Sequence, residues 1–133
     1  MKILIIDRIG FQLQTRKMLL EEESECSVDS ASSVGEVFIA FNKGEYDVVI
    51  IDHGIENGEV LFHHLLGIDP GQPILVVSDA IHCVISRCED CVKRHTIRRL
   101  YNPVAIETIV RTVKGMKLLK CDHYDEETNK IGQ

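Results

Sequence analysis

Polar residues that could form a functional site stand directly after apolar runs of the sequence. Three such runs end on Asp7, Asp52 and Ser78. If the runs are parallel strands, these residues lie along one edge of a sheet, where open α/β sheets bind ligands and carry chemistry. Arg8, which directly follows Asp7, and Asn102, which follows the last predicted strand, would lie along the same edge. The plainer alternative is that the two acids only end their strands and accept backbone hydrogen bonds.

A second candidate for chemistry is a cysteine pattern. Cys83, Cys88 and Cys91 have the C-x₄-C-x₂-C spacing of a plant-type [2Fe–2S] ligand set. His82 and His95 could supply further ligands to iron or zinc. The pattern falls within a predicted helix, where the three thiols share a broad face but do not converge on a metal as in a loop. Buried thiols that act as small hydrophobes are the alternative.

Strands and helices alternate along the chain, and this alternation predicts where the candidate residues are placed. Runs of β-branched and apolar residues predict five strands. Apolar residues at helical spacing predict about five helices. Ser32-Ser33 is a cap for the second helix, and Asn102-Pro103 marks the start of the last one. The predicted strands are 2–7, 26–31, 46–52, 74–78 and 96–101, and the predicted helices are 11–22, 34–41, 59–66, 80–93 and one after Pro103.

This alternation predicts an α/β fold with a parallel sheet and right-handed crossovers. Five β-α units of this size favour the flavodoxin-like, doubly wound order 2-1-3-4-5, with helices on both faces in three layers, α/β/α. The first and third strands are then neighbours. Asp7 and Asp52 are therefore expected to meet.

Length and composition fit one globular domain. The chain has 133 residues, of which 44% are hydrophobic and 27% charged, which argues against general disorder. We expect a domain over residues 1–119 and a polar tail or linker over 120–133. No apolar run is long enough to cross a bilayer and no signal-peptide pattern is present. A cytoplasmic location is expected, where five cysteines remain thiols or ligands.

The charge is unevenly distributed. Residues 87 to 120 contain nine Lys or Arg and three Asp or Glu, which is a net charge of +6. Because the whole chain has a net charge of −6, the other residues together carry −12. A basic third on an acidic domain favours an acidic partner surface or weak nucleic-acid contact. The alternative is a solvated face with dispersed charges.

Four pieces of the sequence, by their order and spacing, resemble the CheY-like receiver domain of two-component response regulators. The resemblance covers nearly all of residues 1 to 119. In that family an aspartate at the place of Asp52 accepts a phosphoryl group from a histidine kinase. Asp7 would help to bind Mg²⁺, and Ser78 would bond the phosphoryl oxygens. The matching pieces are Ile3-Leu4-Ile5-Ile6-Asp7, Tyr46-Asp47-Val48-Val49-Ile50-Ile51-Asp52, Pro73-Ile74-Leu75-Val76-Val77-Ser78 and Asn102-Pro103.

The chain departs from the family pattern at several positions. Arg8 replaces a second acid, Asn102 replaces a Lys, and Arg99 stands where the family commonly has an aromatic residue. The loss of a carboxylate and the gain of a guanidinium should weaken a Mg²⁺ site formed by Asp7 and Asp52. Arg8 has two alternative roles: an ion pair that occupies Asp52 and holds one conformation without phosphate, or a substitute cation for a phosphoryl group.

Three functions follow as hypotheses. The first is a degenerate receiver, or pseudo-receiver, that signals by binding a protein such as a histidine kinase or an output domain, with phosphorylation of Asp52 weak or absent. The second is a working phospho-acceptor, whose only reaction would be its own phosphorylation at Asp52, so the chain is not expected to be an enzyme otherwise. The third is a metal or redox sensor that uses the three cysteines. The resemblance also suggests a homodimer through the 80–117 face, with neither membrane nor direct nucleic-acid binding.

Overall fold

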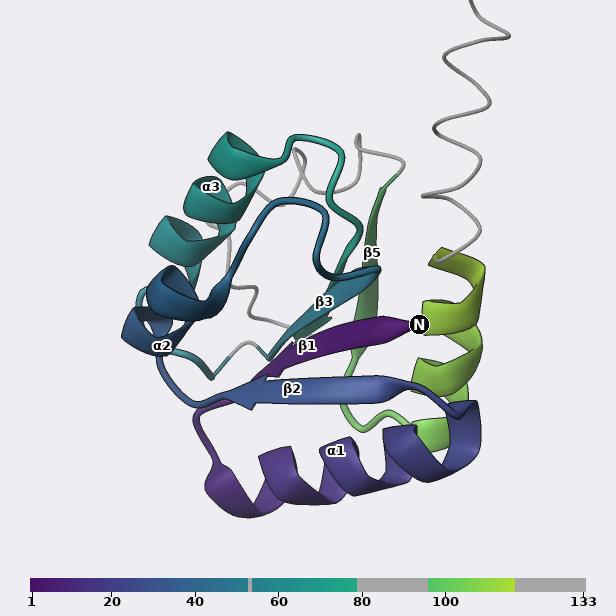
Figure 1. The fold of residues 1–133 in the computed structure, drawn as a ribbon. Helices are drawn as coiled ribbons and strands as arrows, with labels where there is room; N and C mark the ends of the chain where they lie inside the picture. The colour runs from purple at the N-terminus through teal and green to yellow at the C-terminus, as the bar shows by residue number, and fades with distance from the viewer. Residues whose placement is uncertain (53, 79–95, 117–133) are drawn as a thin grey trace, which may run out of the picture.

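A five-stranded parallel sheet forms the centre of the molecule in the computed structural model, which describes residues 1–52, 54–78 and 96–116 (Figure 1). The strand order is β2-β1-β3-β4-β5, as predicted. Each neighbouring pair is parallel. The strands are β1 (Lys2–Ile6), β2 (Ser27–Ala31), β3 (Val48–Asp52), β4 (Ile74–Ser78) and β5 (Ile97–Tyr101).

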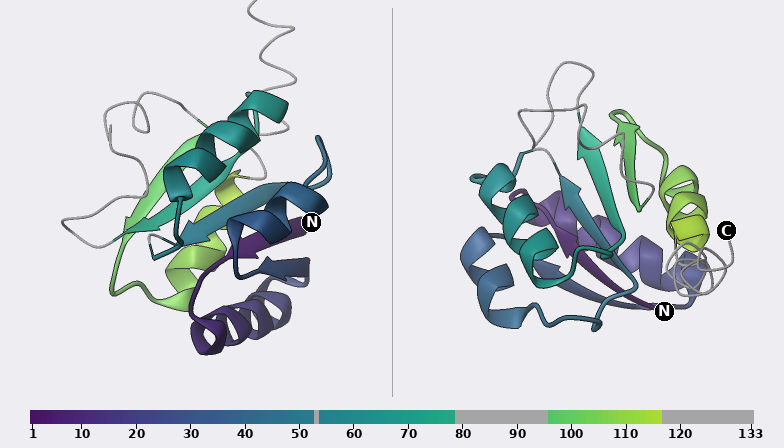
Figure 2. Two further views of the ribbon diagram at one scale, coloured as in Figure 1. Left: turned by 90° about the vertical axis from the view of Figure 1, so that its left-hand side faces the viewer. Right: turned by 90° about the horizontal axis from the view of Figure 1, so that it is seen from above.

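Helices cover both faces of this sheet. Helix α1 (Gly10–Ser24) and the helix over residues 106–116 lie on one face, and α2 (Val34–Ala40) and α3 (Gly58–Ile68) lie on the other (Figures 1 and 2). The described ranges therefore hold four helices in the predicted three-layer arrangement. Their length and apolar character are insufficient for any of them to span a membrane.

The central strand β3 is buried along its whole length. Its side chains alternate between the two faces, so Val49 and Ile51 pack in one apolar cluster with α2 and α3, whereas Val48 and Ile50 pack in another with α1 and the helix 106–116. A strand that supplies both cores must be apolar on both sides. This requirement explains the unbroken apolar run that ends on Asp52.

The predicted cap of α2 is confirmed. Ser33 is the N-cap residue, and its hydroxyl accepts a hydrogen bond from the backbone N–H of Glu36 at 3.3 Å. The Glu36 carboxylate in turn accepts from the backbone N–H of Ser32 at 2.8 Å. These bonds satisfy donors that a helix start otherwise leaves unpaired.

Several boundaries differ from those predicted. β3 begins at Val48, two residues later than predicted. The two residues before it make side-chain contacts: the Tyr46 hydroxyl donates to Asp29 at 2.7 Å, and Asp47 accepts from the backbone N–H of Lys2 at 2.8 Å. Helix α3 is longer than the predicted 59–66. The last helix starts at residue 106 and not directly at Pro103.

Two predictions lie outside the described residues. These are the helix over 80–93, which contains the three cysteines of the metal hypothesis, and the polar tail over 120–133.

Candidate functional site

Two buried carboxylates lie close together at the carboxyl ends of β1 and β3. Ile6 is opposite Ile51 in the parallel register, so the next residue of each strand, Asp7 and Asp52, comes to the same edge of the sheet. Asp7 is 0% and Asp52 2% exposed. The predicted meeting of the two acids is thus observed. Two negative charges buried side by side require partners, because their desolvation and mutual repulsion are both unfavourable.

Helix α1 supplies partners that bridge the two acids. The Gln12 amide nitrogen lies 2.6 Å from Asp7 Oδ2 and 3.3 Å from Asp52 Oδ2. One terminal nitrogen of Arg16 lies 2.9 Å from Asp52 Oδ2 and 3.6 Å from Asp7 Oδ2. Residues four apart in a helix lie on the same face, so both side chains reach the pair from a single surface of α1.

Backbone donors hold the other oxygen of each carboxylate. The N–H of Ile9 donates to Asp7 Oδ1 at 2.9 Å, and the N–H of Gly54 donates to Asp52 Oδ1 at 2.9 Å. A Cβ atom at Gly54 would lie 3.3 Å from the same Asp52 oxygen, closer than most Cβ contacts. The absence of a side chain at Gly54 therefore lets the loop backbone approach the carboxylate.

These contacts restrict the chemistry available to Asp52. A carboxylate that attacks phosphorus must offer an oxygen lone pair, and the charge that develops must be absorbed by cations. Both oxygens of Asp52 already accept charge-assisted or backbone hydrogen bonds. The amide of Gln12, the guanidinium of Arg16 and the backbone N–H of Gly54 therefore surround the carboxylate that the resemblance gives as the phospho-acceptor.

Ser78 and Asn102 lie at the same edge of the sheet: Ser78 ends β4, the neighbour of β3, and Asn102 directly follows β5. The backbone N–H of Asn102 donates to the carbonyl of Ser78 at 2.7 Å. The Ser78 side chain is fully buried, and its hydroxyl has no hydrogen-bond partner among the described residues. Such a group is expected to bond to a ligand or to water. Thus four of the five predicted site residues, Asp7, Asp52, Ser78 and Asn102, gather at one edge.

Among the described residues, Asp52 forms its ion pair with Arg16 and not with Arg8, the partner that the sequence suggests. Arg8 is exposed and lines a separate hollow of about 330 Å³ with residues such as Ser33 and Asn57. Arg16 makes the ion pair with Asp52 in its place. The physical reason is that Arg8 follows a buried strand residue and projects to the other side of the chain, whereas α1 turns Arg16 back over the strand ends.

Sequence reasoning missed Gln12 and Arg16. The available signal was their spacing: two polar residues four apart, in the helix that directly follows Asp7, next to the buried Leu13 and Leu20 of the same helix. Periodicity could place them on one side of the apolar stripe. It could not show which edge of the sheet that side faces.

The residues present do not fit a Mg²⁺ ion between Asp7 and Asp52. Mg²⁺ requires octahedral oxygen ligands at about 2.0–2.1 Å, whereas here two nitrogen donors, from Gln12 and Arg16, already occupy the region between the two Oδ2 atoms. A guanidinium beside the ion would also repel it. The described residues contain no group of three His, Cys, Asp or Glu side chains that could hold a metal.

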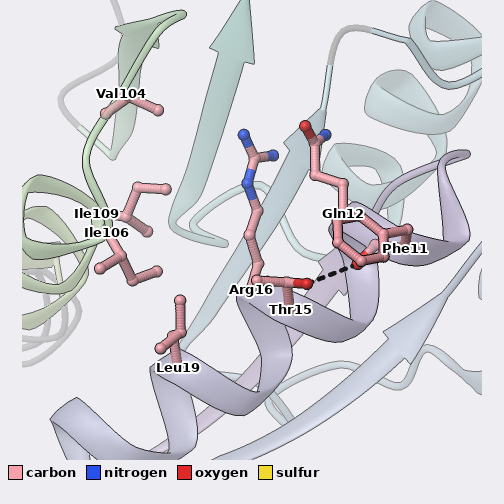
Figure 3. Close-up of a pocket in the computed structure, with 8 residues that line it drawn as sticks. All are labelled: Phe11, Gln12, Thr15, Arg16, Leu19, Val104, Ile106 and Ile109. Atoms are coloured by element: carbon pink, nitrogen blue, oxygen red, sulfur yellow. Dashed lines mark hydrogen bonds between the residues drawn. The ribbon is translucent and has the colours of Figure 1, made fainter.

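An apolar hollow adjoins the carboxylate pair. It has a volume of about 360 Å³ and lies between α1 and the segment that leads into the helix 106–116 (Figure 3). Gln12 and Arg16 extend along one side of it, and apolar side chains face them from the other (Figure 3). Its lining residues are Phe11, Gln12, Thr15, Arg16, Leu19, Val104, Ile106 and Ile109.

Part of the basic third of the chain is described. Arg98, Arg111 and Lys114 are exposed, and Arg99 is partly buried. Against Glu107, the four bases give residues 96–116 a net charge of +3. Arg87 and Arg94 lie outside the described residues.

Comparisons with known proteins connect this geometry to solved structures. No protein-family model and no curated protein matches the sequence. The crystal structure of adenylate cyclase from Rhodopirellula baltica aligns with a TM-score of 0.80 and 19% identity, over 97% of this chain and 96% of that chain.

Receiver domains align with similar quality. A response regulator receiver domain protein from Clostridium thermocellum aligns with a TM-score of 0.74 and 23% identity, over 90% of this chain and 95% of that one. The non-phosphorylated HemR receiver domain from Leptospira biflexa aligns with a TM-score of 0.75 and 14% identity, over 87% and 93%. With its strand order and the acids at the ends of β1 and β3, the chain has the fold of a CheY-like response-regulator receiver domain.

Proposed function

We propose that this chain is a receiver-like module of two-component signal transduction that acts by binding a protein partner, with phosphorylation of Asp52 weak or absent. The fold supports the signalling class, since several solved receiver domains share it. The observation that supports weak or absent phosphorylation is the ion pair between Arg16 and Asp52, at 2.9 Å.

The ion pair bears on phosphorylation for an electrostatic reason. Phosphoryl transfer to a carboxylate depends on cations that neutralise the developing charge at the phosphoryl oxygens. Among the described residues, the cation that contacts Asp52 is Arg16, which is committed to the carboxylates themselves, and the family's Lys is replaced by Asn102. Asp52 is therefore held by hydrogen bonds to Gln12, Arg16 and Gly54, and the surface of the domain is left as the means of signalling.

Mass spectrometry tests this proposal directly. The protein is incubated with acetyl phosphate and Mg²⁺, and its intact mass is compared with that of Asp52→Asn. We expect both proteins to keep their mass, while a receiver with the complete set of acids and Lys gains one phosphoryl group under the same conditions. A near-stoichiometric gain in the wild type that disappears in Asp52→Asn would contradict the proposal.

One observation favours a working phospho-acceptor as the second candidate. The buried Ser78 hydroxyl, without a partner among the described residues, stands where the family bonds phosphoryl oxygens. In that case Ser78→Ala lowers the phosphorylated fraction measured in the same experiment. The metal or redox hypothesis rests on Cys83, Cys88 and Cys91, outside the described residues, and metal analysis of protein purified under reducing conditions tests it separately.

A further inference from the structure

The donors from α1 occupy the point where a bridging ion would stand. Both Gln12 and Arg16 contact the same two atoms, Asp7 Oδ2 and Asp52 Oδ2, at 2.6 to 3.6 Å. A divalent cation shared by two carboxylates must also lie between one oxygen of each. The guanidinium and an ion therefore compete for one position.

Arg16 also brings a cationic side chain into a largely buried position between the two acids. Its guanidinium lies 2.9 Å from Asp52 Oδ2 and 3.6 Å from Asp7 Oδ2, and its side chain is only 12% exposed. The Gln12 amide and the backbone N–H groups of Ile9 and Gly54 contact the same two carboxylates.

The stem of Arg16 runs along apolar surface. Arg16 lines the apolar hollow beside Leu19, and Ile106 and Ile109 lie across from it (Figure 3). The methylene groups of an Arg side chain bury well against such apolar surface, while its head reaches a charged partner. The stem of Arg16 thus borders apolar surface, while its head reaches the two carboxylates at the strand ends.

We propose that Arg16, assisted by Gln12, is a built-in cation that replaces the divalent metal at Asp7 and Asp52, so that Mg²⁺ binds there only when Arg16 is removed. This inference rests on the proposed function and names the cause of its weak or absent phosphorylation. Arg16 is a positioning residue in this account, because it acts through the two carboxylates and not on a substrate.

The experiment is a titration of the full chain with MgCl₂, followed by ¹H–¹⁵N NMR. The backbone amides of Asp7, Ile9, Asp52 and Gly54 report on the site. In the wild type we expect no saturable shift of these amides over the millimolar range. In Arg16→Met we expect a saturable shift confined to them, with an affinity at least about tenfold tighter, because a unit positive charge a few ångströms from the ion has been removed.

A matched control is Lys17→Met, which removes the neighbouring positive charge of α1, a side chain paired with Glu21 and not with the two acids. It should titrate like the wild type. Asp52→Asn added to Arg16→Met should abolish the new shift. If Arg16→Met does not fold, as judged by circular dichroism, Arg16→Gln serves as the second variant, since it removes the charge and retains a hydrogen-bonding side chain.

Two results would overturn the inference: saturable Mg²⁺ shifts of these amides in the wild type, or a folded Arg16 variant that does not bind Mg²⁺. Neither result decides the proposed function, which the mass measurement tests independently. If the wild type gains a phosphoryl group, the proposal of weak phosphorylation is refuted. If the wild type stays unphosphorylated and Arg16→Met does not bind Mg²⁺, only the proposal of a built-in cation is refuted.

Discussion

At the scale of single residues, Tyr46 illustrates how a buried polar group depends on its partner. Its hydroxyl donates to Asp29 at 2.7 Å, and Lys2 forms an ion pair with the same carboxylate at 3.6 Å. Burial, followed by the hydrogen bond to the negatively charged Asp29, raises the pKa of the Tyr46 phenol above its usual 10. The folded protein thus favours the neutral phenol more strongly than the unfolded chain does.

The raised pKa predicts a pH dependence with a definite sign. A group whose pKa is higher in the folded state adds stability that is complete below its unfolded pKa, here 10.0, and is lost as the pH rises toward the folded pKa. Tyr46→Phe should lower the free energy of unfolding at neutral pH by about 1–2 kcal/mol through the lost hydrogen bond.

Urea unfolding of both proteins at neutral pH and above pH 10 measures this difference. The gap between wild type and Tyr46→Phe should narrow at high pH, because the unfolded wild-type chain ionises its phenol first. A gap that stays constant across the range would show that the phenol has the same pKa in both states.

At the scale of elements, β3 and α2 differ in what they contribute. β3 is buried on both faces and supplies both hydrophobic clusters. Helix α2 is short, with Val37 as its buried residue, and it leaves Ile39 88% exposed. The stability of the fold should therefore depend much more on the central strand than on this helix.

Two isoleucines test that difference with the same substitution. Ile50→Ala, at a position 1% exposed, should lower the free energy of unfolding by about 2–5 kcal/mol, since it removes buried methyl groups and leaves a cavity. Ile39→Ala should change it by less than about 0.5 kcal/mol. Chemical denaturation of both variants is the measurement, and comparable losses would mean that α2 packs in solution against something further.

The sequence predicts the strands and helices better than it predicts which side chains contact one another. The apolar runs of β1, β3 and β4 and the Ser33 cap could be identified directly, because strand periodicity and capping depend on neighbouring residues only. Strand order brought Asp7 and Asp52 together. The role of Arg16, by contrast, depends on how α1 is rotated about its axis, which long-range packing decides. For that reason the sequence suggests an ion pair of Asp52 with Arg8, the nearer residue in the chain, as one of two alternatives, and does not reveal Arg16.

At the scale of the whole molecule, charge separates two regions. Residues 96–116 carry a net charge of +3 on β5 and the last helix, whereas the full chain carries −6. An uneven distribution of this kind guides association with a partner of opposite charge. A partner of opposite charge, as in the proposed function, would meet this part of the molecule.

Charge reversal tests this surface. Arg98→Glu combined with Arg111→Glu should weaken binding to an acidic probe, a labelled polyglutamate peptide, by about tenfold at low salt, with about 0.2–1 kcal/mol lost per exposed charge pair. It should also reduce the salt dependence of that binding. Lys43→Glu, in the loop between α2 and β3, is the control. Fluorescence anisotropy at two salt concentrations gives both quantities, and equal losses for the control would argue for a nonspecific charge effect.

The position of Arg16 on α1 has a consequence for how the edge of the sheet could respond to its surroundings. A dissolved ion binds according to its concentration, whereas a cation attached to a packed helix has a fixed, high effective concentration. If Arg16 replaces the metal as proposed, a chelator finds no dissolved ion to withdraw at this site. A displacement of α1 would carry Arg16 and Gln12 away together, and Asp7 and Asp52 would lose both side-chain partners that this helix supplies. The two carboxylates would then respond to the movement of one helix and not to the concentration of an ion.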